Sequence, residues 1–371
     1  MVEGSGHLFS TVYNQFGLEV DLNSANPLAQ VWGNQATPDG TVIDFDADLQ
    51  LQQADFFFQS FCGAWYEQAN RYGDGIGFES DVWLAAEEWN IQYVFPNGNA
   101  DAIETLGLAA VVVDVDNEVA YTAPALGQSG YEKILPINPL SEDYVVLVLA
   151  GYNYEQEPAP LKIYVGRKDM DADGNAVDYA TASARDTFLA QNGLLHGKIY
   201  GMAVENSAYG ALGIDTVDAN AKMFDTYMRD AGAADTFDVR FYATDYQWGG
   251  FDETVAVKDT EIFLWDDADQ QPEGFTFFNG DTKVEHPAVD PDISNQRWIQ
   301  NLTDEGGMIG VTLTDFLEQI QAAADAGNLL PEFVSGEVTR IVPAVDGALT
   351  LETGDKGIGN GLEGTTADET A

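Results

Sequence analysis

The sequence has little positive charge, a single cysteine and no long apolar run. Its 371 residues contain 15 Lys and Arg against 62 Asp and Glu, so the formal net charge is −47. This balance disfavours a nucleic-acid partner or an anionic membrane surface, because both need clustered cations. No stretch approaches the roughly 20 apolar residues of a membrane-spanning helix. We therefore expect neither nucleic-acid binding nor membrane insertion.

The single cysteine, Cys62, excludes an internal disulfide. Its remaining roles are a small buried apolar residue, a reactive thiol or a metal ligand. The first residues lack the basic and apolar regions of a signal peptide, which predicts either a cytosolic chain or the mature form of an exported one. The acid excess is explained by adaptation to salt, by bound divalent cations, or by both.

Short β-branched or aromatic runs, bounded by Gly, Asp, Asn or Pro, are typical of strands. They occupy residues 108–115, 144–150, 161–165, 198–204, 239–243, 261–265, 275–278, 297–301 and 338–342. Helical spacing is confined to residues 187–192, 219–231 and 312–326. The pattern predicts an all-β architecture, a propeller or a sandwich, with a few inserted short helices. Residues 353–371, rich in Gly, Thr and acids, are expected to form a flexible tail.

The stretch from Ser60 to Asn90 contains the strongest candidates for catalytic or metal-binding residues. Cys62 lies near its start, and the pair Glu87 and Glu88 follows the apolar run 82–86. If a strand continues through them, adjacent carboxylates point to opposite faces, so one can reach an interior site while the other braces a loop. The alternative is a buried cysteine with a solvated glutamate pair.

A second group of oxygen ligands lies in DMDADGNAVD, residues 169–178. Its acids alternate as in the first half of a calcium loop, with Gly174 at the sharp turn. The candidate ligands are Asp169, Asp171, Asp173, Asn175 and Asp178. A structural calcium ion and a simple Asp-Gly hairpin turn with solvated acids are both open.

The order of several segments resembles the PhoX-type alkaline phosphatase family. The matching segments are FCGA at 61–64, FESDVWLAAEE at 78–88, YTAPALGQSGYEK at 121–133, LKIYVGRK at 161–168, NGLLHGKIYGMAV at 192–204 and GDTKVEHPAVDPDISNQRWIQNLTDE at 280–305. That family has a β-propeller fold. The resemblance therefore implies a single propeller domain of about six diverged blades over residues 1–352.

The resemblance also implies the hydrolysis of phosphate monoesters by a cluster of Fe³⁺ and Ca²⁺. It assigns iron binding to the thiol of Cys62 and further metal binding to several carboxylates. These carboxylates belong to Glu87 or Glu88, Glu132, Asp292, Asp304 and Glu305.

The chemistry of the residues favours metals independently of the resemblance. A phosphate monoester is a dianion, and a strongly negative protein repels it unless local cations invert the field. Carboxylates suit calcium and iron, whereas a thiolate suits iron but not calcium. Arg297 and, more weakly, Lys133 are the candidate side-chain cations for the phosphate.

These observations predict a secreted or periplasmic phosphate monoester hydrolase that acts on a small phosphate ester. The predicted catalytic set is Cys62, Glu87, Glu88, Glu132 and Arg297. The competing hypothesis is a non-catalytic, calcium-stabilised acidic propeller that serves as a binding or surface scaffold. It is favoured by the segment 151–153, which reads Gly-Tyr-Asn where the family usually has acids.

Overall fold

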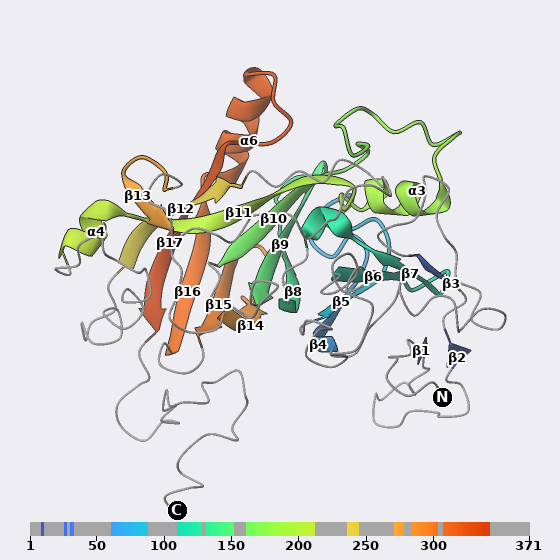
Figure 1. The fold of residues 1–371 in the computed structure, drawn as a ribbon, viewed down its shortest axis with the longest axis horizontal. Coiled ribbons are helices and arrows are strands. Elements are labelled where there is room, and N and C mark those ends of the chain that lie inside the picture. The colour runs from blue at the N-terminus through green and yellow to red at the C-terminus, as the bar shows by residue number, and fades with distance from the viewer. Residues whose placement is uncertain are drawn as a thin grey trace, which may run out of the picture.

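The protein is built mainly from antiparallel β-sheet, with few helices (Figure 1). The computed structural model describes residues 9–10, 26–27, 30–32, 61–87, 110–127, 131–151, 161–211, 236–244, 271–277, 284–302 and 307–341. The prediction of an all-β architecture with inserted short helices is confirmed. Among the described residues, no helix combines the length and the apolar character needed to cross a membrane.

The largest sheet follows a path of nine antiparallel strands. Their order is β14 (Val284–Val289), β15 (Arg297–Leu302), β16 (Gly307–Thr314), β17 (Phe333–Ile341), β12 (Thr236–Ala243), β11 (His196–Glu205), β10 (Lys162–Arg167), β9 (Tyr144–Gly151) and β8 (Tyr131–Ile137). A tenth strand, β13 (Phe275–Phe277), also pairs with β11. The sheet curls until its two end strands, β14 and β8, come into contact, which makes it a nearly closed barrel.

Side-chain amides join the two ends of this barrel. The Nδ2 atom of Asn138, after β8, donates to the carbonyl of Ile293 (2.9 Å). The Nε2 atom of Gln296, before β15, donates to the carbonyl of Asn138 (2.8 Å). These two bonds link the β8–β9 turn to the β14–β15 turn, so the seam of the barrel is held at this end.

The barrel interior is a packed apolar core. Alternate residues of the nine strands fill it, among them Trp298, Phe241 and Tyr200, all with 0% exposure. Phe316 and Ile320 of helix α6 (Phe316–Asp325) pack against the same core. The interior is therefore filled by side chains and is not a channel.

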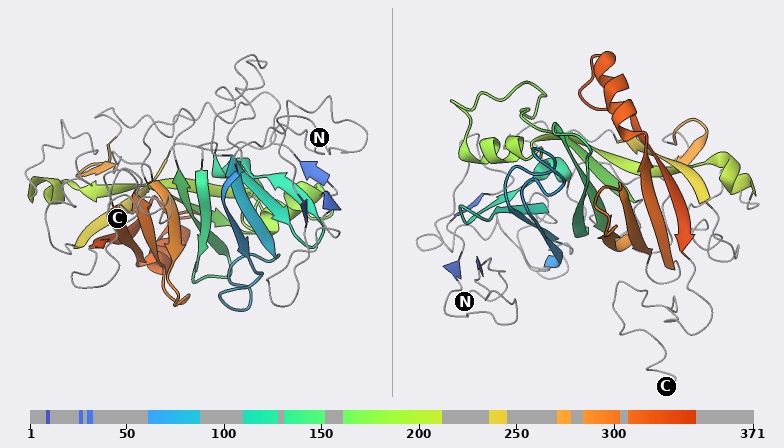
Figure 2. Two further views of the ribbon diagram at one scale, coloured as in Figure 1. Left: turned by 90° about the horizontal axis from the view of Figure 1, so that it is seen from below. Right: turned by 180° about the vertical axis from the view of Figure 1, so that it is seen from behind.

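A second, five-stranded sheet packs outside the barrel. Its order is β3 (Gln30–Trp32), β7 (Val119–Thr122), β6 (Ala110–Asp114), β5 (Val82–Glu87) and β4 (Phe61–Glu67). A second apolar core lies between this sheet, helix α3 (Ala184–Gln191) and the outer faces of β8 to β11. Figures 1 and 2 show the small sheet on the side of β8 and β9, with β14 to β17 on the other side. The remaining described elements are β1 (Phe9–Ser10), β2 (Asn26–Pro27), the 3₁₀ turn η2 (Pro124–Leu126) and α4 (Asn206–Ala211).

Several predicted elements shift or fall outside the described part. The helix predicted over 312–326 begins only at Phe316, because residues 312–314 belong to β16 and Asp315 has a left-handed φ of 52°. The helix predicted over 187–192 is α3 and begins earlier, with Ser183 as its N-cap. The predicted strand 261–265, helix 219–231, domain boundary at 352 and tail 353–371 lie outside the described residues.

The six-bladed propeller is not confirmed. Separate blades would each contain about four strands that pair with one another and not with the next blade. The described strands instead pair continuously from β14 to β8. Strand lengths and turn signals are alike in blades and barrels, so the pattern of short runs did not distinguish these two architectures.

Tyr164 of β10 is packed against glycines inside the sheet. Its hydroxyl donates to the carbonyl of Gly193 (3.0 Å). A Cβ atom at Gly197 of β11 would lie 2.2 Å from the Cζ atom of the Tyr164 ring. The ring therefore occupies the space that any other side chain at position 197 would need.

We expect Gly197→Ala to lower the free energy of unfolding by about 1 to 3 kcal/mol, the usual cost of overpacking. Tyr164→Leu removes the ring atoms that the new methyl group would meet. In that background the added cost of Gly197→Ala should largely disappear, as measured by chemical unfolding of all four proteins. Equal costs in both backgrounds would show that the ring does not impose the glycine.

Candidate functional site

The paired strands β4 and β5 bring two of the predicted metal ligands to one end of the small sheet. Phe61 pairs with Glu87, and Cys62 pairs with Ala86. Cys62 and Glu87 therefore occupy neighbouring positions on adjacent strands. Directly paired residues have Cα atoms about 4.5 to 5.5 Å apart, so Cys62 lies this close to Ala86, and Glu87 is its diagonal neighbour, one position further along β5.

Glu132 reaches the same place from the barrel, through a contact between two bulges. The register of β4 shifts between Cys62 and Trp65, and the register of β8 shifts between Tyr131 and Lys133. Gly63 has a φ of 56°, and a Cβ atom built there would lie 2.1 Å from the carbonyl oxygen of Glu132. The backbone positions of Cys62, Glu87 and Glu132, far apart in the sequence, therefore lie near the place where the two sheets meet.

The carboxylate of Glu132 is buried at this junction, with 5% exposure. The neighbouring Tyr131 donates its hydroxyl proton to the carbonyl of Leu126 (2.6 Å). Its ring lies 5.4 Å from the Nζ atom of Lys162, which is fully buried. Burial lowers the pKa of Lys162 to about 7. The sequence reasoning did not single out Lys162, whose position in an apolar strand gives no local sign of a site.

A second cation lies beside Glu132. The Nζ atom of Lys133 is 5.0 Å from the centre of the Trp65 ring, and the guanidinium of Arg71 is 5.6 Å from it. Burial lowers the pKa of Lys133. Positive side chains therefore gather at the junction of the sheets, in a chain that carries few of them.

Trp65 is held by a buried glutamate. Its Nε1 atom donates to Oε2 of Glu67 (2.7 Å), and Nη1 of Arg71 donates to the same oxygen (3.0 Å). The Glu67 side chain is 1% exposed, and its burial raises its pKa, although both bonds act in the opposite direction. Ionising the Glu67 carboxyl group therefore takes more free energy in the folded protein than in water.

Arg297 and Asp292, two other predicted site residues, lie at the opposite end of β8. They belong to the β14–β15 turn and the start of β15, which contact Asn138 just beyond the end of β8. The strand rise places this end about 20 Å from Glu132. The structure therefore does not bring Arg297 or Asp292 to the Cys62–Glu87–Glu132 junction.

Both residues are engaged locally at that end. Nη2 and Nε of Arg297 contact Oδ2 of Asp290 at 2.5 and 2.7 Å. Hydrogen bonds from the hydroxyl and backbone N–H of Ser294 hold the pKa of Asp292 below its usual value. Asp292 is exposed.

The segment 169–178 forms a tight hairpin. Met170 and Ala176 form an isolated antiparallel bridge, and the backbone N–H of Asn175 donates to Oδ1 of Asp171 (2.8 Å). The Tyr179 hydroxyl donates to Asp169. Asp178 accepts the backbone N–H of Ala180, and Asp173 is exposed. The acids thus support the turn, and calcium binding here stays a prediction.

The remaining predicted ligands, Glu88, Asp304 and Glu305, lie outside the described residues. In the described part of the chain, no group of three His, Cys, Asp or Glu side chains is arranged to hold a metal ion. Of the junction residues, the side chain of Glu132 is described, whereas Cys62 and Glu87 are placed by their strands. A metal at the junction would therefore need donors beyond Glu132.

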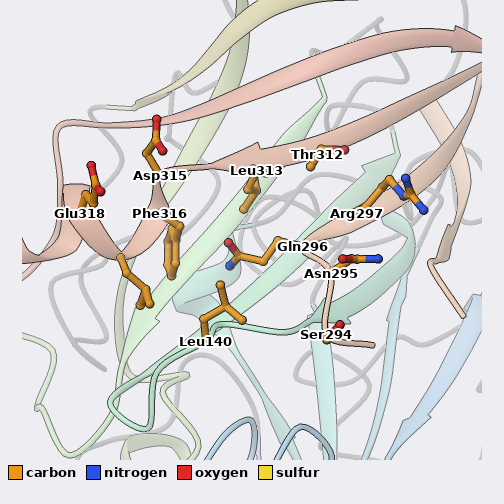
Figure 3. A pocket seen from close by; sticks show the side chains of 11 residues that line it. Leu140, Ser294, Asn295, Gln296, Arg297, Thr312, Leu313, Asp315, Phe316 and Glu318 are labelled. Atoms are coloured by element: carbon orange, nitrogen blue, oxygen red, sulfur yellow. The ribbon is translucent and has the colours of Figure 1, made fainter. Parts of the chain in front are cut away.

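A pocket of about 400 Å³ lies at the end of the barrel that contains Arg297 (Figure 3). It is formed by the β8–β9 turn, the β14–β15 turn and the start of α6. Its lining residues are Leu140, Ser294, Asn295, Gln296, Arg297, Thr312, Leu313, Asp315, Phe316, Leu317 and Glu318. The sequence reasoning missed this pocket, because its walls come from three segments that are distant in the chain.

The bulge contact predicts a strong effect of Gly63→Ala. The added methyl group would meet the Glu132 carbonyl, and the left-handed φ is unfavourable for alanine. We expect a loss of more than about 2 kcal/mol in the free energy of unfolding. Gly274→Ala also has a positive φ but open space around it, so it controls for the backbone term. Similar losses in both variants would argue against the close contact.

The burial of Glu67 predicts a pH-dependent stability difference. A raised folded pKa means that the folded protein holds the Glu67 proton more tightly, so stability falls as pH rises above about 4.5. Glu67→Gln should remove this part of the decline. The melting temperature of the variant, relative to wild type, should therefore increase between pH 4 and pH 7. A flat difference for Glu67→Gln would contradict the raised pKa.

Comparisons with known proteins leave the function to be argued from this geometry. No protein-family model, curated protein or solved structure matches the chain. The meeting point of β4, β5 and β8 is where residues singled out from the sequence come together in space. We therefore place the candidate site at that junction.

Proposed function

We propose that the protein is a metal-dependent phosphate monoester hydrolase with its metal site at the junction of β4, β5 and β8. Cys62, Glu132 and one of Glu87 and Glu88 would hold the metals. The observation that carries this proposal is the bulge contact at Gly63, which brings the backbone of Glu132 against the residue that follows Cys62, while the pairing of β4 with β5 places Glu87 diagonally across from Cys62. The metals themselves are those implied by the sequence resemblance, Fe³⁺ and Ca²⁺.

The residue types at the junction fit this metal pair. A thiolate and carboxylates together form a mixed donor set, in which the sulfur suits iron and the oxygens suit either ion. The side chain of Glu132 is buried, and metal coordination is one of the ways in which proteins accommodate a buried charge. Metal ions bound here would polarise a phosphoryl oxygen and lower the pKa of a coordinated water.

The protein's own cations have a supporting role in this proposal. Lys133 follows Glu132 directly and lies over Trp65, and Lys162 is buried beside Tyr131. When protonated, they offset part of the negative field that a phosphate dianion must approach, and this contribution falls as pH rises because burial lowers the pKa of both lysines. Arg297 is left out of the site, because it lies at the far end of β8 and is paired with Asp290.

The proposal does not need a propeller. In the proposed site the ligands come from the contact between a small sheet and a barrel-like sheet, not from a ring of blades. The six-bladed architecture therefore stays a prediction from the resemblance alone. The competing proposal is a non-catalytic protein stabilised by calcium, for which the candidate ligands are the closely spaced carboxylates of the exposed hairpin 169–178.

Elemental analysis of the purified protein tests the metals first. We expect iron and calcium in the wild type, and loss of iron in Cys62→Ser and Glu132→Gln. If the strand continues through residues 87 and 88, only one of Glu87→Gln and Glu88→Gln should lose metal, because adjacent side chains face opposite ways. The exposed Glu332→Gln serves as the matched control and should keep the wild-type metal content.

Turnover of p-nitrophenyl phosphate in calcium-containing buffer tests the reaction. Substitution of a residue that only hydrogen-bonds a metal ligand typically lowers activity roughly 10- to 100-fold. The variants that lose the metal itself should lose more activity than this. Arg297→Gln should keep wild-type activity. A protein that binds no iron, cleaves no ester and still melts at a higher temperature with calcium would contradict the hydrolase and support the scaffold.

A further inference from the structure

The pocket at the seam of the barrel is separate from the proposed metal site. It lies beyond the C-terminal end of β8, whereas Glu132 is at the N-terminal end of the same strand. Its volume of about 400 Å³ falls within the usual range for small-molecule sites. The residues that line it determine which class of ligand can bind.

Hydrogen bonds between backbone and side chains hold the walls of the pocket in place. Gln296 donates to the carbonyl of Asn138, and Oδ1 of Asn138 accepts the N–H of Leu140 (2.8 Å). The N–H of Leu313 donates to the carbonyl of Gln296 (2.9 Å). The three segments that line the pocket are therefore fixed relative to one another, which reduces the ordering cost of binding.

The apolar part of the lining is exposed at some conformational cost. Leu140 and Leu317 are 39% and 45% exposed and are two of the six large hydrophobic residues described as exposed. Leu140 also has a φ of 55°, an unfavourable value for a bulky residue. Figure 3 shows Leu140 facing Gln296 and Phe316 across the pocket. An apolar surface held open in this way can be covered by the apolar body of a ligand.

The charges around the pocket favour a cation. The positive charge of Arg297 is paired with Asp290, and Figure 3 shows the Arg297 side chain extending away from Leu140. Asp315 and Glu318 are exposed on the rim, and neither carboxylate makes a hydrogen bond or an ion pair with the residues that the structure describes. The net charge of −47 adds a field that attracts cations and repels anions.

We propose that this pocket binds a small organic ammonium ion with an apolar body. The apolar part packs between Leu140, Leu317 and Phe316, and the ammonium group lies toward Asp315 and Glu318. The proposal stands independently of the hydrolase, because it uses residues at the other end of the barrel. The N-terminus of α6 also lies here and would prefer an anion, so the sign of the ligand charge is the decisive test.

A matched series of probes tests the ligand class with the full chain. Butylammonium, butanol and butyrate share an apolar body and differ in charge. Because such ligands have few non-hydrogen atoms, we expect butylammonium to bind with a dissociation constant on the order of millimolar. Calorimetric titration at constant ionic strength should show weaker binding of butanol and no binding of butyrate.

Four substitutions locate the site. Asp315→Asn and Glu318→Gln should each weaken butylammonium about 2- to 5-fold, as for an exposed ion pair. Leu140→Ser and Leu317→Ser should weaken it up to about 10-fold, through loss of apolar contact. Asp325→Asn, at the far end of α6, is the control and should leave the affinity unchanged. All five side chains are exposed, so the variants are expected to fold.

Any of four outcomes would overturn the proposal. Tighter binding of butyrate would show an anion site at the start of α6. Equal binding of butanol and butylammonium would show that the carboxylates do not contribute. Absence of saturable binding in the millimolar range, or an equal loss in Asp325→Asn, would show that this pocket is not the site.

Discussion

The contact between Gly63 and the carbonyl of Glu132 is the constraint on which the functional reading depends. Each partner lies at an irregularity of its strand, and a side chain at position 63 would prevent the approach. Without this contact, β4 and β5 would pack against β8 through their side chains alone. With it, the backbones of the small sheet and the barrel come together beside the positions of Cys62 and Glu132.

The rest of the fold makes this junction rigid. One apolar core fills the barrel, and a second fills the space between the barrel and the small sheet. Trp65 packs against both cores. Its Nε1 atom donates a hydrogen bond to Glu67, and the cations of Arg71 and Lys133 lie over its ring. The cationic and aromatic groups beside Glu132 are therefore part of the structural support and of the local field at the same time.

The end of the barrel at the seam differs from the junction of the two sheets in its contacts and in its exposed residues. There the seam is joined by amide hydrogen bonds, and the surface beside them combines exposed leucines with carboxylates on the rim. The two ends are separated by the length of β8 and by a filled interior. A ligand at one end therefore has no open path through the barrel to the other.

Sequence reasoning succeeded where a strand is continuously apolar. Residues 144–150 and 161–165 were predicted as strands, and they form β9 and most of β10. Their short runs of Val, Leu and Ile are typical of strands that are buried on both faces. It missed β8, in which Glu132, Lys133 and Pro136 interrupt the apolar pattern. The pairing of strands is a long-range property, so blades and barrel were not distinguished.

The contrast between local sequence patterns and long-range contacts also applies to the candidate sites. Cys62, Glu87 and Glu132 were singled out by residue type and by the order of motifs; the strands bring their backbone positions to one region, and a shared metal stays a prediction. Arg297 was chosen because cations are few and because it lies in a segment that resembles the family, and in the structure it pairs with Asp290 of the neighbouring turn. The pocket at the seam has no local signature, because three turns build it.

The central claim is that the thiol of Cys62 and the carboxylate of Glu132 share a metal. X-ray absorption at the iron edge of the purified protein tests this directly, since the chain has one cysteine. The account predicts bound iron with a single sulfur neighbour and several oxygen neighbours, with the sulfur signal lost in Cys62→Ser. Iron without any sulfur neighbour, or a protein that binds no iron, would contradict it.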